Sequence, residues 1–576
     1  MCGVFAITGE SNNSGDIVLE GLKKLEYRGY DSWGIAVKGE KTIKGVGKIS
    51  DVSMKFPSGN TSIGHTRWAT HGAVTKKNAH PHTQGRVTLV HNGIAENYLE
   101  IKKGLPKKYR MVSETDSEIL AALIDSLLKK DPKSALRKAS KMIEGRFALV
   151  VMIEGFSGIW IVRRGSPLII GRGKKETYVA SDIPAFLKHT NVVNYLDDGE
   201  LAHINGGSVE VFNIETGKPV KKRNIVVDWD QEQATKDGWP HFMIKEIIEQ
   251  KETILNTLNH KSSVVEKFVN SMKKKKGSYM IGSGTAHKAA MFGEYLFAEV
   301  ANRKINVVRS EEMKVFERFI KKGTSIVAIS QSGETADALE VLEYGVKNGA
   351  KILSITNTPS SSIARMSDQH ICINTGIEKA VASTKAMTAQ MALLLLCAYS
   401  DGPGISYGRR ILQETGANIN DMLNPRYSKH IEKIAKKISK EENMFIIGRN
   451  SLYPMALEAA IKIQEVSYIH AQGFAAGELK HGPIALNQKG TICVVLGDDT
   501  QTLTNAIELK ARGAKILGIS PTNPDVFDYW IRVPDCGTAQ AIATVIPTQL
   551  LAYYLAISRG VNPDMPRNLA KSVTVK

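Results

Sequence analysis

The residue best suited to chemistry is Cys2, which stands directly behind Met1 and before Gly3. Removal of Met1, which the small side chain of Cys2 permits, would leave a thiol and a free α-amine on one residue. An α-amine titrates at about pH 8, so it can accept the thiol proton directly or through a water without a histidine partner. The alternative is a chance cysteine at a frayed terminus. The other reactive residues of the first half favour an N-terminal nucleophile.

Two further segments carry groups suited to acyl transfer from a small amide. Asn92-Gly93 follows the predicted strand 87–91, and an Asn side-chain amide beside a Gly N–H can hold an oxyanion. The same dipeptide is also a common hairpin turn, so alone it is a weak signal. Arg67, in the segment 65–72, can bind a carboxylate through two hydrogen bonds. Asp116 can bind an ammonium.

These groups occur with Cys2-Gly3 and with the segments EYRGYDS (26–32), HNG (91–93) and SETDSE (113–118). Together, in this order, they resemble the class II, N-terminal-nucleophile glutamine amidotransferases. The resemblance implies a four-layer αββα domain in which Cys2 attacks the glutamine amide. It further implies that the other residues act as follows: Asn92 and Gly93 hold the oxyanion, Arg67 binds the carboxylate, Asp116 binds the α-amine, and Trp68, Thr70, His71 and His80 line the site.

In the second half, the segment SQSGET (330–335) follows an apolar run and opens the predicted helix 336–347. Hydroxyls and backbone N–H groups at a helix N-terminus can bind a phosphate; an ordinary capped helix is the alternative. The segment GSGT (282–285) ends another predicted strand, where an open α/β sheet binds ligands. The segment VASTK (381–385) adds further hydroxyls.

The second half also repeats itself. YMIG (279–282) is echoed by FIIG (445–448), and GAKIL (349–353) recurs at 513–517 with nearly the same offset. We therefore predict two tandem domains of one fold, each a doubly wound parallel sheet covered by helices. The predicted fold class is α+β and α/β, with the four-layer αββα domain followed by these two domains.

The composition changes along the chain predict the domain boundaries. We expect the amidotransferase domain at 1–220, a polar linker at 221–245, the tandem domains at 246–420 and 421–559, and an irregular tail at 560–576. Within the first domain we expect helices at 16–27 and 115–129, the latter with Thr115 and Asp116 as N-cap groups, and strands at 4–8, 34–38, 88–91 and 147–153.

The repeat, the SQSGET loop and the VASTK segment resemble sugar isomerase (SIS) domains. From Cys2 to Val575 the chain resembles the isomerising glutamine–fructose-6-phosphate aminotransferases. That resemblance implies transfer of the L-glutamine amide nitrogen to D-fructose 6-phosphate, with ketose-to-aldose isomerisation, in the first step of hexosamine synthesis. It implies sugar-phosphate contacts from these residues: Thr285, Ser330, Gln331, Ser332, Thr335, Val381, Ser383, Glu458, Lys462 and Ala570.

The same resemblance assigns three groups to the sugar chemistry. Glu465 is the base for proton transfer between C1 and C2, and His481 opens the sugar ring in the neighbouring subunit's site, which implies a homodimer. Lys571 forms a Schiff base with the open-chain ketose, a role that needs a deprotonated amine. Ammonia must avoid protonation by water on its way to the sugar, so we expect an enclosed apolar passage with Trp68 as its gate.

The spacing of three charged residues is consistent with a shared site. Glu458, Lys462 and Glu465 stand at i, i+4 and i+7, on one face of a helix. The alternative is an exposed, salt-bridged face. Lys571 likewise has an alternative as a solvated charge in the tail. Two positions depart from the family: Ala286 replaces a common serine, and the chain ends in Lys576 where many relatives end in glutamate.

The composition excludes several function classes. The 576-residue chain has a net charge of +18, but the charge is dispersed, which suits anionic small substrates better than nucleic acid. Five scattered cysteines indicate neither disulfides nor zinc and fit a reducing cytoplasm, and the His80-Pro81-His82 segment lacks acidic or thiol ligand partners. We therefore expect no metal and no cofactor. The longest apolar run, 391–398, is too short to span a membrane, and no signal peptide is predicted.

Competing functions remain. Other class II amidotransferases are disfavoured, because the acidic ribose-phosphate loop of amidophosphoribosyltransferase and the SGGxDS-type loop of asparagine synthetase are both missing. A sugar-phosphate-binding regulator, or an amidotransferase acting on another ketose phosphate, stays open. Cys2, Glu465 and Lys571 in one chain argue against the regulator.

Overall fold

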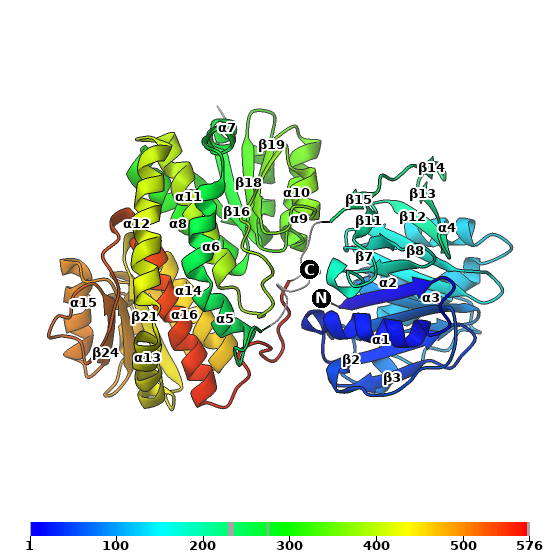
Figure 1. Cartoon of the computed structure of the whole chain (residues 1–576), viewed down its shortest axis with the longest axis horizontal. Coiled ribbons are helices and arrows are strands. Elements are labelled where there is room, and N and C mark those ends of the chain that lie inside the picture. The colour runs from blue at the N-terminus through cyan, green and yellow to red at the C-terminus, as the bar shows by residue number, and fades with distance from the viewer. Residues whose placement is uncertain (1, 228–235, 274–275, 573–576) are drawn as a thin grey trace. The chain divides into compact units, whose positions relative to one another are not determined.

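The computed structural model describes residues 2–227, 236–273 and 276–572, and it divides the chain into two compact units (Figure 1). The first unit comprises Met1–Gln233 and Ala570–Lys576, and the second comprises Ala234–Leu569. The predicted linker 221–245 therefore contains residues outside the described ranges, and its last part is the start of helix α5 (Phe242–Ile248).

The first unit is built on two antiparallel sheets. The eight-stranded sheet has the order β15 (Ile225–Val226), β11 (Val192–Tyr195), β9 (Ile169–Arg172), β10 (Thr177–Ala180), β1 (Gly3–Thr8), β4 (Thr61–Arg67), β2 (Ser32–Val37), β3 (Ile43–Val46). The seven-stranded sheet has the order β14 (Pro219–Val220), β13 (Ser208–Asn213), β12 (Glu200–Asn205), β8 (Ile159–Arg164), β7 (Phe147–Ile153), β6 (Val87–Gly93), β5 (His82–Gln84).

Alternation along the strands explains why two sheets and two helical layers form. On β1, Val4 and Ala6 lie in the core between the sheets, whereas Phe5 and Ile7 lie in the core beneath α1 (Ser14–Lys24), as the period of two in a strand requires. The helices α2 (Tyr98–Gly104), α3 (Asp116–Leu127) and α4 (Pro132–Met142) share a third core with the second sheet. The four-layer αββα fold is therefore confirmed.

In this unit one alternative is excluded and one local prediction was wrong. Asn92-Gly93 is not a hairpin turn, because both residues lie in β6 and pair with β7. Thr115 occupies the N-cap position of α3 but makes no capping hydrogen bond. Its hydroxyl instead lies 3.1 Å from His82 Nε2, so a tertiary contact has displaced the local cap.

The second unit contains two parallel sheets of the same topology. One has the order β17 (Asn306–Arg309), β16 (Ser278–Gly282), β18 (Ser325–Ser330), β19 (Lys351–Thr356), β20 (Gln369–Cys372). The other has the order β22 (His470–Ala475), β21 (Asn443–Gly448), β23 (Ile492–Leu496), β24 (Lys515–Ser520), β25 (Tyr529–Arg532). Each is a 2-1-3-4-5 doubly wound sheet. The repeated YMIG and FIIG segments are strands β16 and β21, so the predicted tandem fold is confirmed.

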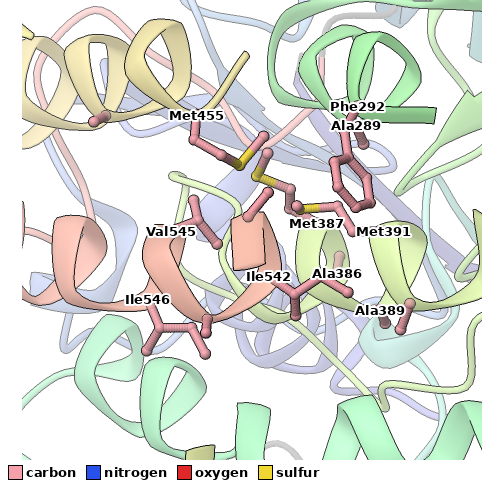
Figure 2. Close-up of a cluster of buried hydrophobic side chains, with 14 of the residues drawn as sticks. Ala289, Phe292, Ala386, Met387, Ala389, Met391, Met455, Ile542, Val545 and Ile546 are labelled. Carbon is pink, nitrogen blue, oxygen red and sulfur yellow. The ribbon is translucent and has the colours of Figure 1, made fainter. Parts of the chain in front are cut away.

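One continuous core joins the helices around these two sheets. Figure 2 shows part of it, where Phe292 of α8 (Gly284–Ala301), Met387 and Met391 of α11 (Lys385–Asp401), Met455 of α14 (Tyr453–Ser467) and Val545 of α16 (Gln540–Ser558) meet. The remaining helices are α6 (Gln250–Asn256), α7 (Ser262–Met272), α9 (Ala336–Lys347), α10 (Ser362–Met366), α12 (Ile405–Met422), α13 (Pro425–Ile438) and α15 (Thr500–Lys510). This core fixes α8 against α14.

Among the described residues, the segment Gly537–Ser558 is long and apolar enough to cross a membrane, with a mean hydropathy of 1.5. In the structure 83% of that stretch is buried inside the protein, where α16 packs on α14 and α13. Thr544, Thr548 and Gln549 interrupt its apolar runs, so each uninterrupted run in it is too short to indicate a membrane span.

Candidate active sites

Cys2 lies beside the strand β4 because β1 and β4 pair with Gly3 opposite Thr66. The backbone N–H of Trp68 lies 3.3 Å from Cys2 Sγ, and the Asn92 side-chain amide donates to Cys2 O at 2.9 Å. Burial raises the pKa of the Cys2 thiol, so the thiol needs a base to become a nucleophile. Met1, whose removal would supply that base, lies outside the described residues.

His65 fixes the orientation of Asn92. Its Nε2 lies 3.1 Å from both Asn92 Oδ1 and His91 O. Burial lowers the pKa of His65 to about 3, so the ring is neutral, and Nε2–H donates to these two oxygens. Nδ1 has no hydrogen-bond partner among the described residues. The Asn92 oxygen therefore points to His65 and its NH₂ group towards Cys2. The sequence motifs do not single out His65, although it opens the 65–72 segment.

Replacing Gly93 with any other residue would distort the backbone. Its φ is +127°, and a Cβ built on it would lie 2.0 Å from Arg146 O. Backbone in this region is accessible mainly to glycine. The strand β6 therefore places the Asn92 amide and a glycine in sequence next to the nucleophile, as an oxyanion site requires.

Asp116 is held by a buried polar network at the start of α3. Its carboxylate accepts from Ala95 N at 2.9 Å and from Ser117 Oγ at 3.3 Å. Ser117 Oγ in turn lies 2.7 Å from His80 Nε2 and 3.0 Å from His91 Nδ1. Burial lowers the pKa of both histidines, so two neutral rings hold the Ser117 hydroxyl that donates to Asp116. Ser117 and His91 are contacts that the sequence motifs contained but did not reveal.

Arg67 is almost fully buried, and its guanidinium donates to three backbone carbonyls of the next loop: those of His71, Gly72 (3.0 Å) and Ala73 (3.2 Å). A guanidinium has five donors, so two remain for a ligand. In the same loop Trp68 and His71 are half-buried and Thr70 is exposed. The structure thus brings Cys2, Arg67, Trp68 and Asn92 together around one strand end.

In the second unit, the hydroxyl groups of the loop between β18 and α9 make hydrogen bonds within the loop. Ser330 Oγ accepts from Gly333 N at 3.0 Å and lies 3.1 Å from Thr335 Oγ1, and Ser332 Oγ accepts from Glu334 N at 3.2 Å. Thr335 is the N-cap residue of α9 but makes no side-chain capping bond. The loop, in which Gln331 is half-buried, therefore presents hydroxyls beside an uncapped helix start.

Carboxylates occupy other helix starts in this unit, among them those of α15 and α11. Asp499 accepts from Gln501 N and Thr502 N at the start of α15, which is the counterpart of α9 in the second sheet. Glu378 accepts from Thr384 N and Ala386 N around the start of α11, and Ser383 donates to it at 3.0 Å. An anion is favoured at a helix N-terminus, and at these two positions the protein supplies its own.

The charged residues of α14 form a buried cluster. Lys462 Nζ lies 3.3 Å from Glu458 Oε1 and 2.7 Å from Glu465 Oε2, and Thr285 donates to Glu458 at 3.0 Å. Glu458 is 0% and Lys462 1% exposed, so the alternative of an exposed ion-paired face is wrong. Burial raises the pKa of Glu458. Burial opposes the charge on Lys462, but the two carboxylates outweigh it and raise its pKa.

The remaining residues predicted for the sugar site belong to other segments of the chain. His481 is exposed at the end of the short helix η9 (Glu478–Lys480). Val381 is tied by its N–H to Asp564 O at 3.0 Å. Ala570 and Lys571 are grouped with the first unit, so their part in a sugar site stays a prediction. Among the described residues, no three His, Cys, Asp or Glu side chains are placed to hold a metal ion.

Comparison with known proteins supports the domains predicted for both halves of the chain. Residues 65–188 match the glutamine amidotransferase domain, and residues 271–400 and 437–559 match the SIS domain. The chain is 38% identical to the glutamine–fructose-6-phosphate aminotransferase (isomerizing) of Thermococcus kodakarensis and 40% identical to that of Methanosarcina acetivorans, with full coverage of both chains in each case. It belongs to the isomerising glutamine–fructose-6-phosphate aminotransferase family.

Among solved structures, the family is represented by the C-terminal domain of the glucosamine–fructose-6-phosphate aminotransferase from Francisella tularensis. That chain is 31% identical, with a TM-score of 0.53, and covers 58% of this chain and 100% of its own. Ala286, where we expected relatives to carry a serine, lies in the first turn of α8. The other departure, Lys576, lies outside the described residues.

Proposed function

We propose that this chain transfers the amide nitrogen of L-glutamine to D-fructose 6-phosphate and isomerises the product, giving D-glucosamine 6-phosphate and L-glutamate. The observation that carries the glutamine half is the contact between Asn92 and Cys2. It supports an oxyanion site next to a nucleophile. The full-length similarity to aminotransferases of that name supports the pairing of the two halves.

In the first half-reaction the Cys2 α-amine, freed by loss of Met1, accepts the thiol proton. The thiolate forms a bond to the amide carbon, and the oxyanion is held by Asn92 and Gly93. Collapse of the adduct breaks the C–N bond and releases ammonia, and water then hydrolyses the thioester to glutamate. Arg67 binds the substrate carboxylate and Asp116 its α-ammonium, with Thr70, His71 and His80 lining the site.

In the second half-reaction the phosphate lies on residues 330–335 at the start of α9. Hydroxyl donors and an uncapped helix start support this placement, since both favour an anion. His481 of a neighbouring subunit opens the ring, and the Lys571 amine condenses with the C2 carbonyl with loss of water. Ammonia replaces the lysine at C2.

Glu465 then moves a proton from C1 to C2. The ion pair with Lys462 supports this role, because it holds the Glu465 carboxylate in one position beside the buried cluster. The proposal includes a homodimer in the cytoplasm, an enclosed passage for ammonia gated by Trp68, and no nucleic-acid or membrane partner. It also includes sugar contacts from Ala570, Val381 and Ser383.

The test is glucosamine 6-phosphate formation by purified protein whose mature N-terminus is verified by mass spectrometry. We expect synthesis from glutamine and fructose 6-phosphate. Cys2→Ala should abolish it while fructose 6-phosphate binding persists. Binding without turnover by the wild type would instead identify a sugar-phosphate regulator, and faster turnover of another ketose phosphate would reassign the substrate.

A further inference from the structure

Lys288 is a buried lysine for which neither the fold nor the proposed mechanism accounts. It lies in the second turn of α8 and is only 6% exposed. Within the described part of the chain its ammonium has no hydrogen-bond or ion-pair partner. The charged groups that surround it are Glu458, Lys462 and Glu465 of α14, together with Arg309 at the end of β17.

A structural role does not explain this lysine. The two carboxylates of α14 are already paired by Lys462, at 3.3 Å and 2.7 Å, so Lys288 is not needed to neutralise them. Burying a further charge without a partner is costly, and burial lowers the pKa of Lys288 accordingly. An apolar residue of similar length would pack in its place at less cost. Such a costly arrangement is common at binding and catalytic sites.

The position of Lys288 points to the sugar site. Thr285 and Lys288 are three residues apart on α8 and therefore share a face, and Thr285 donates to Glu458. The strands β16 and β18 are parallel neighbours, so the start of α8 and the loop 330–335 lie at the same sheet edge. Glu458 Oε2, on the same side of α14, is enclosed and has no hydrogen-bond partner among the described residues.

We propose that Lys288 is an additional substrate-binding residue, whose ammonium donates a hydrogen bond to a sugar oxygen near C1 and C2 of the ketose phosphate. The proposal rests on the proposed function, because it needs an open-chain sugar phosphate in this site. It assigns Lys288 to the sugar oxygens beside Glu465 and leaves the phosphate to the loop 330–335.

The test compares Lys288→Met with wild type by calorimetric titration. Methionine keeps the length and removes the charge. We expect the Kd for fructose 6-phosphate to rise about tenfold to a hundredfold, the size of one charge-assisted hydrogen bond. The Kd for inorganic phosphate should stay unchanged, and the Tm should stay equal or rise because an unpaired buried charge is gone. Lys304→Met, at an exposed position after α8, controls for the loss of one positive charge.

Several outcomes would overturn the assignment. Unchanged affinity for fructose 6-phosphate in Lys288→Met would remove the residue from the site, and a lower Tm with unchanged affinity would make it a packing residue. An equal loss of affinity for inorganic phosphate would contradict the placement at the sugar oxygens. If wild-type protein fails to bind fructose 6-phosphate, the proposed function is at fault instead. Glutamine hydrolysis without sugar should be the same in all three proteins.

Discussion

Asn92 donates from its side-chain amide to the carbonyl of Cys2 at 2.9 Å, while its own oxygen faces His65. Because an amide has one oxygen and one NH₂ end, the contact with His65 decides which end faces the nucleophile. The orientation of the Asn92 amide is thus set by a neutral histidine on β4 of the other sheet.

Asn92→Ala should lower kcat for glutamine hydrolysis about a hundredfold to a thousandfold, the usual effect of removing one oxyanion donor, with little change in KM. Steady-state glutamate release measures both parameters. Asn191→Ala, at an exposed position in the same unit, is the matched control. An unchanged kcat would mean that Asn92 does not contact the oxyanion.

His65 should make the first unit sensitive to acid. Burial lowers its folded-state pKa from 6.5 to about 3, so below pH 6.5 the unfolded chain binds a proton that the folded chain excludes. The contribution to stability is present above pH 6.5 and is lost as the pH falls towards 3. At pH 5 the loss is about 2 kcal/mol.

Urea unfolding at pH 8 and pH 5 measures this effect. His65→Gln should reduce the difference between the two pH values, because glutamine does not titrate, whereas the exposed His430→Gln in the second unit should not. Equal pH dependence in wild type and His65→Gln would show that His65 is not the group that resists protonation.

Ser332→Glu should weaken fructose 6-phosphate binding at least a hundredfold. The new carboxylate would repel the phosphate and occupy the start of α9, as Asp499 does at α15. Gln501→Glu adds the same charge in the first turn of α15 and should leave binding unchanged. Calorimetric titration decides the matter, and an unaltered Kd for Ser332→Glu would move the phosphate to a different loop.

Lys571→Arg should abolish hexosamine formation and spare folding and basal glutaminase activity. The guanidinium keeps the charge but stays protonated and does not add to a carbonyl. Borohydride reduction with fructose 6-phosphate, followed by peptide mass spectrometry, should place a sugar adduct within residues 568–576 of wild type and none in the variant. Robust synthesis by Lys571→Arg would exclude the Schiff base.

Features that depend on local sequence were predicted well. The helix 336–347 is α9, and the YMIG and FIIG repeats are strands β16 and β21, because apolar runs bounded by glycine mark strand and helix ends. The charged face of α14 follows from its spacing alone. Its burial does not, because that depends on α8 and α16 packing against it.

Contacts between distant segments could not be predicted, because they also depend on how the elements pack. His65 acts on Asn92 only because β4 and β6 come together in adjacent sheets, and the hydroxyl of Thr115 leaves its helix to reach His82. Lys288 reads as an ordinary helix lysine until the core shown in Figure 2 presses α8 against α14. A single sequence does not indicate which polar residues become buried in this way.

Asp499 makes a duplicated fold asymmetric. Both sheets have the same strand order, and a helix follows the third strand of each. One aspartate side chain caps the helix start in the second copy, so we expect no second phosphate site there. Titration with a sugar phosphate should therefore saturate at a single equivalent per chain. The second parallel sheet would then have a structural role.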